Sequence, residues 1–201
     1  MKLYHMPMSR SVRVLWLLEE LGEKYDLVTI DADNEEHKKP EYLAINPNGS
    51  VPTLVDGDLT IYESAAICAY LADKAPDQKL APAVGTPERG LYYQWLFYGM
   101  TELEPPLLQI AYHTVFLPEG ERSIDQIQDG IDRYQPVAAV LSNALQGKEF
   151  ILGKSFSVAD IVLATAYFWL EDRSILGSHP VVEGYVKRLL ERPAFQRAIA
   201  D

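Results

Sequence analysis

The apolar pattern of the chain changes near residue 75, and this change limits the possible folds more than any other feature of the sequence. Before it, short runs rich in β-branched and apolar residues alternate with helical patterns; after it, every periodic segment has helical spacing. Between the two parts, Lys74–Pro87 contains several prolines and lacks apolar periodicity, which is typical of an exposed linker. We therefore expect a mixed α/β domain at residues 1–75, a linker at 76–87 and an all-helical domain at 88–201.

The pattern before residue 75 predicts the element order βαβαββα. Gly22 ends the first helix, Asn46-Pro47-Asn48-Gly49 ends the second, and Asp56-Gly57-Asp58 is a turn signal that suits a β-hairpin. The expected strands are Lys2–His5, Asp26–Ile30, Pro52–Val55 and Leu59–Tyr62, and the expected helices are Arg10–Leu21, Pro40–Ile45 and Ser64–Ala72.

The second part of the chain predicts helices and no second sheet. Pro105 and Pro106 are expected to break the first of these helices, and Pro136 is expected to kink or end the second near Tyr134. Aromatic residues crowd the first helix, and we expect most of them to lie in the core. The expected helices are Arg89–Phe116, Ser123–Leu145, Ser157–Trp169 and Val181–Leu190, and the aromatic residues are Tyr92, Tyr93, Trp95, Phe97, Tyr98 and Tyr112.

The composition argues against several classes of protein. Hydrophobic residues make up 48% of the chain, enough for a sizeable core, and the net charge of −11 opposes binding to nucleic acid or to an anionic membrane surface. The single cysteine, Cys68, rules out an internal disulfide and fits a reducing compartment. Pro7 and Arg10 stand where a secretion signal needs an apolar core, and no apolar run of about 18 residues follows. We expect a cytoplasmic protein.

Pro52 is unusual because it opens a strand that should be central, where proline would withhold a ladder hydrogen bond. A cis Val51-Pro52 peptide bond resolves this conflict and leaves the backbone N–H and C=O of Val51 available to an extended peptide ligand. An ordinary trans bond at the start of a strand is the alternative.

Two strand-to-helix junctions carry groups that suit an anionic ligand. Ser64 is expected at a helix N-terminus, where its hydroxyl and nearby N–H groups can receive a carboxylate, and Glu63 beside it can pair with an ammonium group. Ser9 and Ser11 flank Arg10 at the start of the first helix, where the helix dipole and a hydroxyl can stabilise a thiolate. Helix capping is the structural alternative at both junctions.

Taken together, three segments resemble the cytosolic glutathione transferase family in order, spacing and residue type. They are MPMSRSVRVLWLLEELG, NPNGSVPTLVDG and IYESAAICAYLAD. The resemblance covers the first domain closely and extends to the second mainly through Ser157-Val158-Ala159-Asp160-Ile161, which is similar to the buried capping box of the family. It implies a thioredoxin-like first domain that holds glutathione and an all-α second domain that provides the electrophile site.

The resemblance, to bacterial members with a serine-type turn as in theta- and delta-like proteins, also implies residue roles. Ser9, two residues after Pro7, corresponds to the catalytic serine, and Ser11 is its competitor for that role. His37 is similar to the position that meets the glycine carboxylate of glutathione, with a solvated basic loop as the alternative. The implied glutathione contacts are Ser9, Arg10, His37, Val51, Pro52, Glu63 and Ser64.

Other chemistries of the family fit this sequence less well. Aligning Pro7 with the proline of tyrosine-type members puts His5 where they carry the catalytic phenol, and the turn contains no cysteine for covalent chemistry. His113 and His179 have no metal-ligand spacing, so we expect packing or surface roles for them and no metal site.

The implied activity is attack of a glutathione thiolate on a small hydrophobic electrophile, with a possible side activity toward peroxides. Glutathione is then a co-substrate, and the family commonly forms homodimers. Two alternatives stay open: a glutathione-binding or interaction protein with little catalysis, and a glutathione-dependent lyase or isomerase. The physiological electrophile is not readable from these residues.

Overall fold

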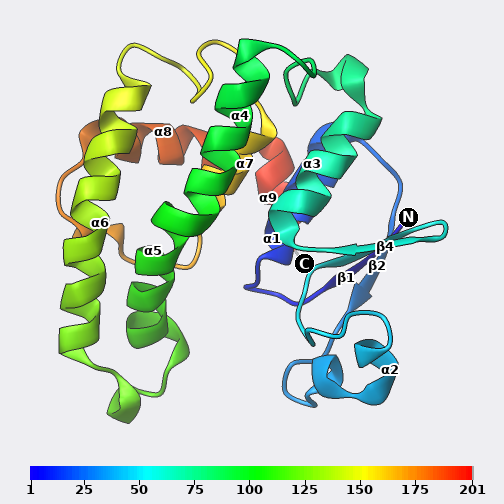
Figure 1. Cartoon of the computed structure of the whole chain (residues 1–201). Helices are drawn as coiled ribbons and strands as arrows, with labels where there is room; N and C mark the ends of the chain where they lie inside the picture. Colours follow the sequence, from blue (N-terminus) through cyan, green and yellow to red (C-terminus); the bar gives the residue numbers. More distant parts are fainter. Residues whose placement is uncertain (201) are drawn as a thin grey trace. The chain divides into compact units, whose positions relative to one another are not determined.

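The computed structural model describes residues 1–200, and the chain divides into two compact units (Figure 1). Unit 1 comprises Met1–Lys79 together with the C-terminal segment that starts at Arg192, and unit 2 comprises Leu80–Glu191. The division after Lys79 falls within the segment expected as a linker. The C-terminal segment belongs to unit 1, whereas the sequence pattern had assigned it to the helical domain.

A four-stranded mixed sheet forms the centre of unit 1. The strands are ordered β2-β1-β3-β4; β1 is parallel to β2 and antiparallel to β3, and β3 and β4 form a hairpin. Gly57, with a φ of 61°, lies in the hairpin turn. The strands are β1 (Lys2–His5), β2 (Asp26–Thr29), β3 (Thr53–Asp56) and β4 (Leu59–Tyr62). The element order βαβαββα of a thioredoxin-like domain is as predicted.

Helices cover both faces of the sheet (Figure 1). The helices α1 (Ser11–Leu21) and α3 (Ser64–Lys74) pack against each other and on the face that carries the buried Leu3 and Leu54. The short α2 (Pro40–Leu43) lies on the other face, where Tyr42 joins the cluster formed with Tyr4 and Val28. The predicted end of α1 is confirmed, because Gly22 follows it with a φ of 66°.

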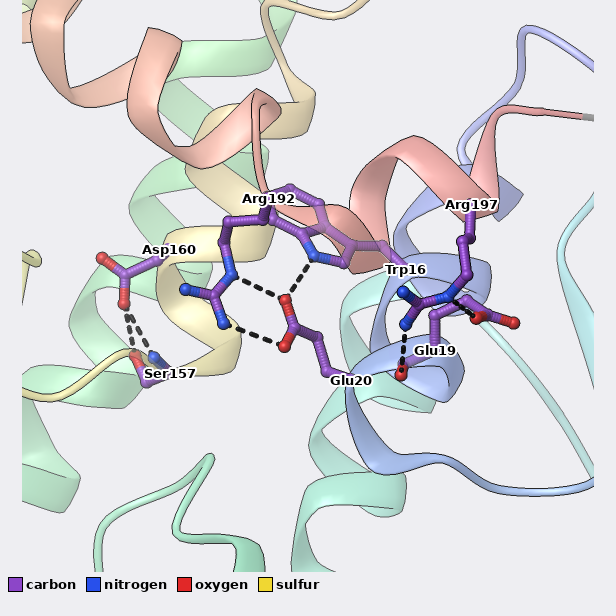
Figure 2. A network of polar contacts seen from close by, with 7 residues as sticks. All are labelled: Trp16, Glu19, Glu20, Ser157, Asp160, Arg192 and Arg197. Atoms are coloured by element: carbon purple, nitrogen blue, oxygen red, sulfur yellow. Dashed lines mark hydrogen bonds and ion pairs between the residues drawn. The ribbon is translucent and has the colours of Figure 1, made fainter.

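The short helix α9 (Pro193–Ala198) returns the chain to α1 of unit 1, as Figure 2 shows. Phe195 packs against Trp16 edge to face with ring centroids 4.9 Å apart. Glu20 accepts two hydrogen bonds from Arg192, at 2.7 and 2.9 Å, and one from the indole Nε1 of Trp16 at 2.9 Å. This contact explains why the C-terminal segment joins unit 1.

Unit 2 is helical. Its α-helices are α4 (Pro87–Tyr98), α5 (Glu104–Ala111), α6 (Ile124–Leu145), α7 (Val158–Thr165) and α8 (Pro180–Leu190), and two π-helical segments, η3 (Gly99–Leu103) and η4 (Tyr112–Phe116), follow α4 and α5. The 3₁₀ segments of the chain are η1 (Glu36–Lys38), η2 (Pro76–Gln78), η5 (Glu119–Glu121) and η6 (Arg173–Leu176).

The prolines at positions 105 and 106 do not break the first long helix of unit 2, contrary to expectation. The π-helical turn η3 ends at Leu103, two residues before Pro105, and the N–H of Glu104 donates to the carbonyl of Gly99, five residues back. A wider turn leaves room for a proline ring that would clash with a carbonyl in a regular helix. The helix α6 likewise continues through the exposed Pro136 as one element.

The helix α7 forms the centre of unit 2, since all of its residues are buried. The predicted capping box at its start is confirmed: the N–H and the hydroxyl of Ser157 donate to Asp160 Oδ2 at 2.9 and 3.0 Å (Figure 2). The N–H of Ile151 and the hydroxyl of Tyr185 donate to Oδ1 at 2.8 and 2.7 Å. Burial raises the pKa of the Asp160 carboxyl, and these hydrogen bonds partly oppose the rise.

The expectation that most aromatic residues near α4 are core residues is wrong. Tyr92 and Trp95 are buried, but Tyr93, Phe97 and Tyr112 are exposed, Phe97 to 68%. The reason is helical geometry, because Tyr93 and Phe97 lie four residues apart and share a face that is not the one turned to the core. Among residues 1–200, no helix is long and apolar enough to cross a membrane.

Candidate functional site

Three segments that carry predicted site residues meet at one end of the unit 1 sheet. Tyr4 of β1 pairs with Thr53 of β3, and Thr53 pairs with Tyr62 of β4. The turn after β1, the residues before β3 and the residues after β4 therefore lie next to one another. These segments contain Ser9 to Ser11, Val51 and Pro52, and Glu63 and Ser64.

The turn between β1 and α1 brings the two candidate hydroxyl groups into contact. Ser9 Oγ lies 2.5 Å from Ser11 Oγ and 2.7 Å from the carbonyl oxygen of Met6, to which it can donate. Ser11 is completely buried, whereas Ser9 is half-buried. Of these two hydroxyl groups, that of Ser9 is therefore the more accessible from solvent.

The backbone of this turn presents Ser9 at the start of α1. Met8 has a φ of 55°, an uncommon value for a residue other than glycine. Arg10 is exposed at the N-cap position and makes no side-chain capping bond. Instead, the N–H of Ser11 donates to Ser9 Oγ at 3.2 Å, and the N–H of Val12 donates to the Ser9 carbonyl at 3.2 Å. Ser9 thus combines a capping contact with a surface position.

His5 also belongs to this cluster, although the sequence did not assign it a role. Its Nδ1 atom lies 2.7 Å from Ser11 Oγ, and the residue is only 4% exposed. The signal that could have revealed it is strand alternation, since His5 follows the buried Leu3 by two residues and so faces α1.

The loop before β3 contains the predicted cis peptide bond between Val51 and Pro52, and both residues are buried. The loop is held by a buried polar network that the sequence did not indicate. Asn46 Nδ2 donates to the carbonyl of Ser50 at 2.8 Å, and the Tyr42 hydroxyl donates to the same oxygen at 2.7 Å. The position of Val51 is therefore fixed by side chains from the α2 region.

His37 lies next to this loop. An added Cβ at Gly49 would lie 3.0 Å from the His37 carbonyl oxygen, so the backbones of these two residues approach closely. Gly49 also has a φ of 58°, a value that favours glycine. Among the residues that the structure describes, the buried Nδ1 atom of His37 has no hydrogen-bond partner. A buried ring nitrogen without a partner is the kind of group that a ligand can satisfy.

At the junction between β4 and α3, the N-cap residue lies one position before Ser64, the residue expected to cap the helix. Glu63 occupies the N-cap position with a φ of 75°, and Ser64 is the first residue of α3. Such a backbone value in a residue other than glycine is often found at ligand sites. The Glu63 side chain is exposed, whereas Ser64 is buried and accepts a hydrogen bond of 3.0 Å from Arg13 Nη1.

The two other histidines make local hydrogen bonds in unit 2. His113 Nδ1 accepts from the N–H of Ser123 at 3.2 Å, and His179 Nε2 lies 2.9 Å from Gln135 Oε1. Within residues 1–200, no group of three or more His, Cys, Asp and Glu side chains is arranged to hold a metal ion.

Comparison with known proteins identifies the family. The model of the glutathione S-transferase N-terminal domain matches residues 1–73, and the model of the C-terminal domain matches residues 124–191. Glutathione S-transferase 1 of Zea mays is 31% identical over 100% of this chain and 96% of its own length.

Solved structures agree with this assignment. Glutathione transferase F7 from Populus trichocarpa has a TM-score of 0.90 at 28% identity, covering 99% of this chain and 97% of that one. The glutathione transferase URE2P6 from Phanerochaete chrysosporium, in complex with oxidized glutathione, has a TM-score of 0.85 at 32% identity. The match covers 98% of this chain and 93% of that one. The chain therefore belongs to the glutathione S-transferase family.

Proposed function

We propose that this glutathione transferase binds glutathione at the end of the unit 1 sheet and activates it through Ser9. The Ser9 hydroxyl donates a hydrogen bond to the glutathione sulfur and so stabilises the thiolate form. The observation that carries this assignment is the difference in exposure between the two serines, because Ser9 is half-buried and Ser11 is completely buried. The N-terminus of α1 adds a favourable field for negative charge.

The γ-glutamyl end of glutathione is proposed to bind at the start of α3. Its carboxylate accepts from the Ser64 hydroxyl and from the first N–H groups of α3, and its ammonium group pairs with Glu63. Support comes from the unusual φ of 75° at Glu63 and from the buried contact of Arg13 with Ser64, which orients the serine. The backbone of Val51, beside Pro52, pairs with the central part of the tripeptide.

The glycine end of glutathione is proposed to lie near His37. The buried Nδ1 atom of His37 and its close approach to Gly49 support this placement. Arg10 is exposed beside Ser9, and its charge offsets the repulsion between an anionic tripeptide and a chain of net charge −11.

The thiolate sulfur attacks an electrophilic carbon and displaces its leaving group, such as the chloride of a chloronitrobenzene, with the bonding electron pair. A hydroperoxide is proposed as a secondary target: the sulfur takes the terminal OH as the O–O bond breaks, the alcohol leaves, and a second glutathione converts the sulfenic acid to glutathione disulfide and water. A hydrogen bond to sulfur supplies the activation, so the proposed mechanism uses no metal. The electrophile is proposed to be small and hydrophobic and to bind to unit 2, where the exposed aromatic side chains of Tyr93, Phe97 and Tyr112 provide apolar surface.

The assembly and location of the protein are part of the proposal. We expect a homodimer, because Leu91 is exposed to 49% on α4 and exposed apolar surface often serves association. The single cysteine, Cys68, is buried and takes part in no disulfide, which supports a cytoplasmic location. Light scattering of the purified protein measures the number of subunits directly.

The test begins with calorimetric titration of glutathione and continues with turnover of a chloronitrobenzene and a hydroperoxide. Ser9→Ala should bind glutathione but lose about 10²-fold in kcat, the effect expected when one donor to a developing anion is removed. Ser155→Ala, at an exposed serine of unit 2, is the matched control and should behave as the wild type.

The outcomes separate the alternatives. Binding by the wild type without turnover of any electrophile would support the non-catalytic glutathione-binding protein, and turnover confined to one lyase or isomerase substrate would support the third alternative. Full activity in Ser9→Ala would exclude Ser9 as the activating residue.

A further inference from the structure

Four atoms form a short hydrogen-bonded cluster behind the surface position of Ser9. Ser11 Oγ lies 2.7 Å from His5 Nδ1, 2.5 Å from Ser9 Oγ and 3.1 Å from the carbonyl oxygen of Met6. Ser9 Oγ lies 2.7 Å from the same carbonyl oxygen. The cluster connects a side chain of β1 to the hydroxyl proposed to meet glutathione.

The protons of this cluster can be counted. Each serine hydroxyl has one proton, and the carbonyl oxygen of Met6 can only accept. The 2.5 Å contact between Ser9 and Ser11 needs one of the two hydroxyl protons, because two oxygen atoms at this distance repel unless a proton lies between them. Which serine supplies that proton depends on His5.

If His5 Nδ1 has no proton, it accepts the proton of Ser11. Ser9 must then use its own proton for the contact with Ser11, and none is left for a ligand. If Nδ1 has a proton, it donates to Ser11, and Ser11 can donate to Ser9. The Ser9 proton is then free to leave the Met6 carbonyl and point to a sulfur atom.

We infer that His5 and Ser11 are positioning residues that direct the Ser9 proton toward the glutathione thiolate, in the order His5 Nδ1–H to Ser11, Ser11 to Ser9, and Ser9 to sulfur. No proton changes its carrier in this arrangement, since only the orientation of the hydroxyl groups differs. The inference rests on the proposed function of Ser9. His5 and Ser11 act through Ser9, because they are 4% and 0% exposed.

The order of the chain has an electrostatic consequence. A hydroxyl group that accepts a hydrogen bond becomes a better donor, so each link strengthens the next. Hydrogen bonding to the charged form of a group lowers its pKa. Loss of either inner link should therefore raise the pKa of the bound thiol while the contacts to the rest of glutathione stay in place.

The experiment is a double-mutant cycle read out by the ultraviolet absorbance of the bound glutathione thiolate as a function of pH. In Ser11→Ala and His5→Leu, the thiol pKa should rise by about one unit, which is a tenfold loss of thiolate below the pKa. In a Ser9→Ala background, the same changes should produce no further rise. His5→Asn, which keeps an N–H donor near the position of Nδ1, should restore the wild-type pKa.

A control variant shows whether a loss of stability alone changes the thiol pKa. Ser157→Ala removes part of the capping box of unit 2 and should lower the melting temperature without changing the thiol pKa. The inference is overturned if folded Ser11→Ala keeps the wild-type pKa, or if its effect is the same with and without Ser9. An unchanged pKa in Ser9→Ala alone would instead refute the proposed function, so the two failures are distinguishable.

Discussion

Arg13 of α1 and Ser64 of α3 meet in the interior of unit 1, where Arg13 Nη1 donates to Ser64 Oγ at 3.0 Å. Both residues are buried, Arg13 completely and Ser64 to within 2%. Because the serine oxygen accepts from a guanidinium group, its own proton is directed elsewhere, and the donor strength of the hydroxyl increases. The contact thus joins α1, the helix that follows Ser9, to the start of the helix proposed to hold the γ-glutamyl carboxylate.

Replacement of Arg13 by methionine should weaken glutathione binding more than it slows the chemical step. The Arg13–Ser64 hydrogen bond is present with and without glutathione, so its typical energy of about 1.5–3 kcal/mol contributes mainly to folding stability, and only the part that orients Ser64 contributes to affinity; we expect the dissociation constant to rise severalfold, up to roughly tenfold. Calorimetric titration measures this change. Arg133→Met, at an exposed arginine of α6, is the control, and equal affinities of the two variants would contradict the role of Arg13.

The contact of Glu20 with Arg192 should stabilise the folded chain, because it joins residues 172 positions apart in a bidentate arrangement. Glu20→Gln removes the charge and should lower the free energy of unfolding by about 1–2 kcal/mol, measured by urea denaturation. The matched control is Lys187→Gln, which breaks the exposed pair of Lys187 and Glu191 and should cost less than about 0.5 kcal/mol. Equal losses would show that the Glu20 contact is an ordinary surface pair.

Local patterns were sufficient to predict much of the fold. Leu59–Tyr62 was predicted with the bounds that β4 has, and Gly22 and Pro52 marked the end of α1 and the cis peptide bond. Each of these features depends on a few neighbouring residues. The return of α9 to α1 depends on contacts such as Trp16 with Phe195, for which no local pattern exists.

The same distinction applies to the site. Spacing from Pro7 selected Ser9 and Ser11 as candidates, but it could not separate them, because burial of a side chain is a property of the packed unit. His5 was missed for the same reason, since its contact with Ser11 requires both the strand register and the turn of α1. The assigned roles of these residues remain predictions that the proposed measurements test.

Asp160 should be important for stability, because its carboxylate accepts four hydrogen bonds in the buried centre of unit 2. Asp160→Ala leaves these donors unpaired, and we expect the free energy of unfolding to fall by about 2 kcal/mol or more. The control is Ser123→Ala, which removes the cap of α6, and the expected cost is about 0.5–1 kcal/mol. Thermal or urea unfolding of both variants measures the difference, and an unchanged stability of Asp160→Ala would refute the structural role.

Cys68 should be unreactive in the folded protein, because complete burial raises the pKa of its thiol to about 12. At about pH 8 the folded chain then has almost no thiolate at this position, and a disulfide reagent should label Cys68 only after denaturation. Between the ordinary thiol pKa of 9.0 and the raised pKa, the unfolded chain has lost this proton while the folded chain keeps it. The contribution of Cys68 to the free energy of unfolding therefore falls as the pH rises above about 9, by at most about 1.4 kcal/mol per pH unit. Comparison with Cys68→Ala isolates this effect, and rapid labelling of the native wild type would contradict it.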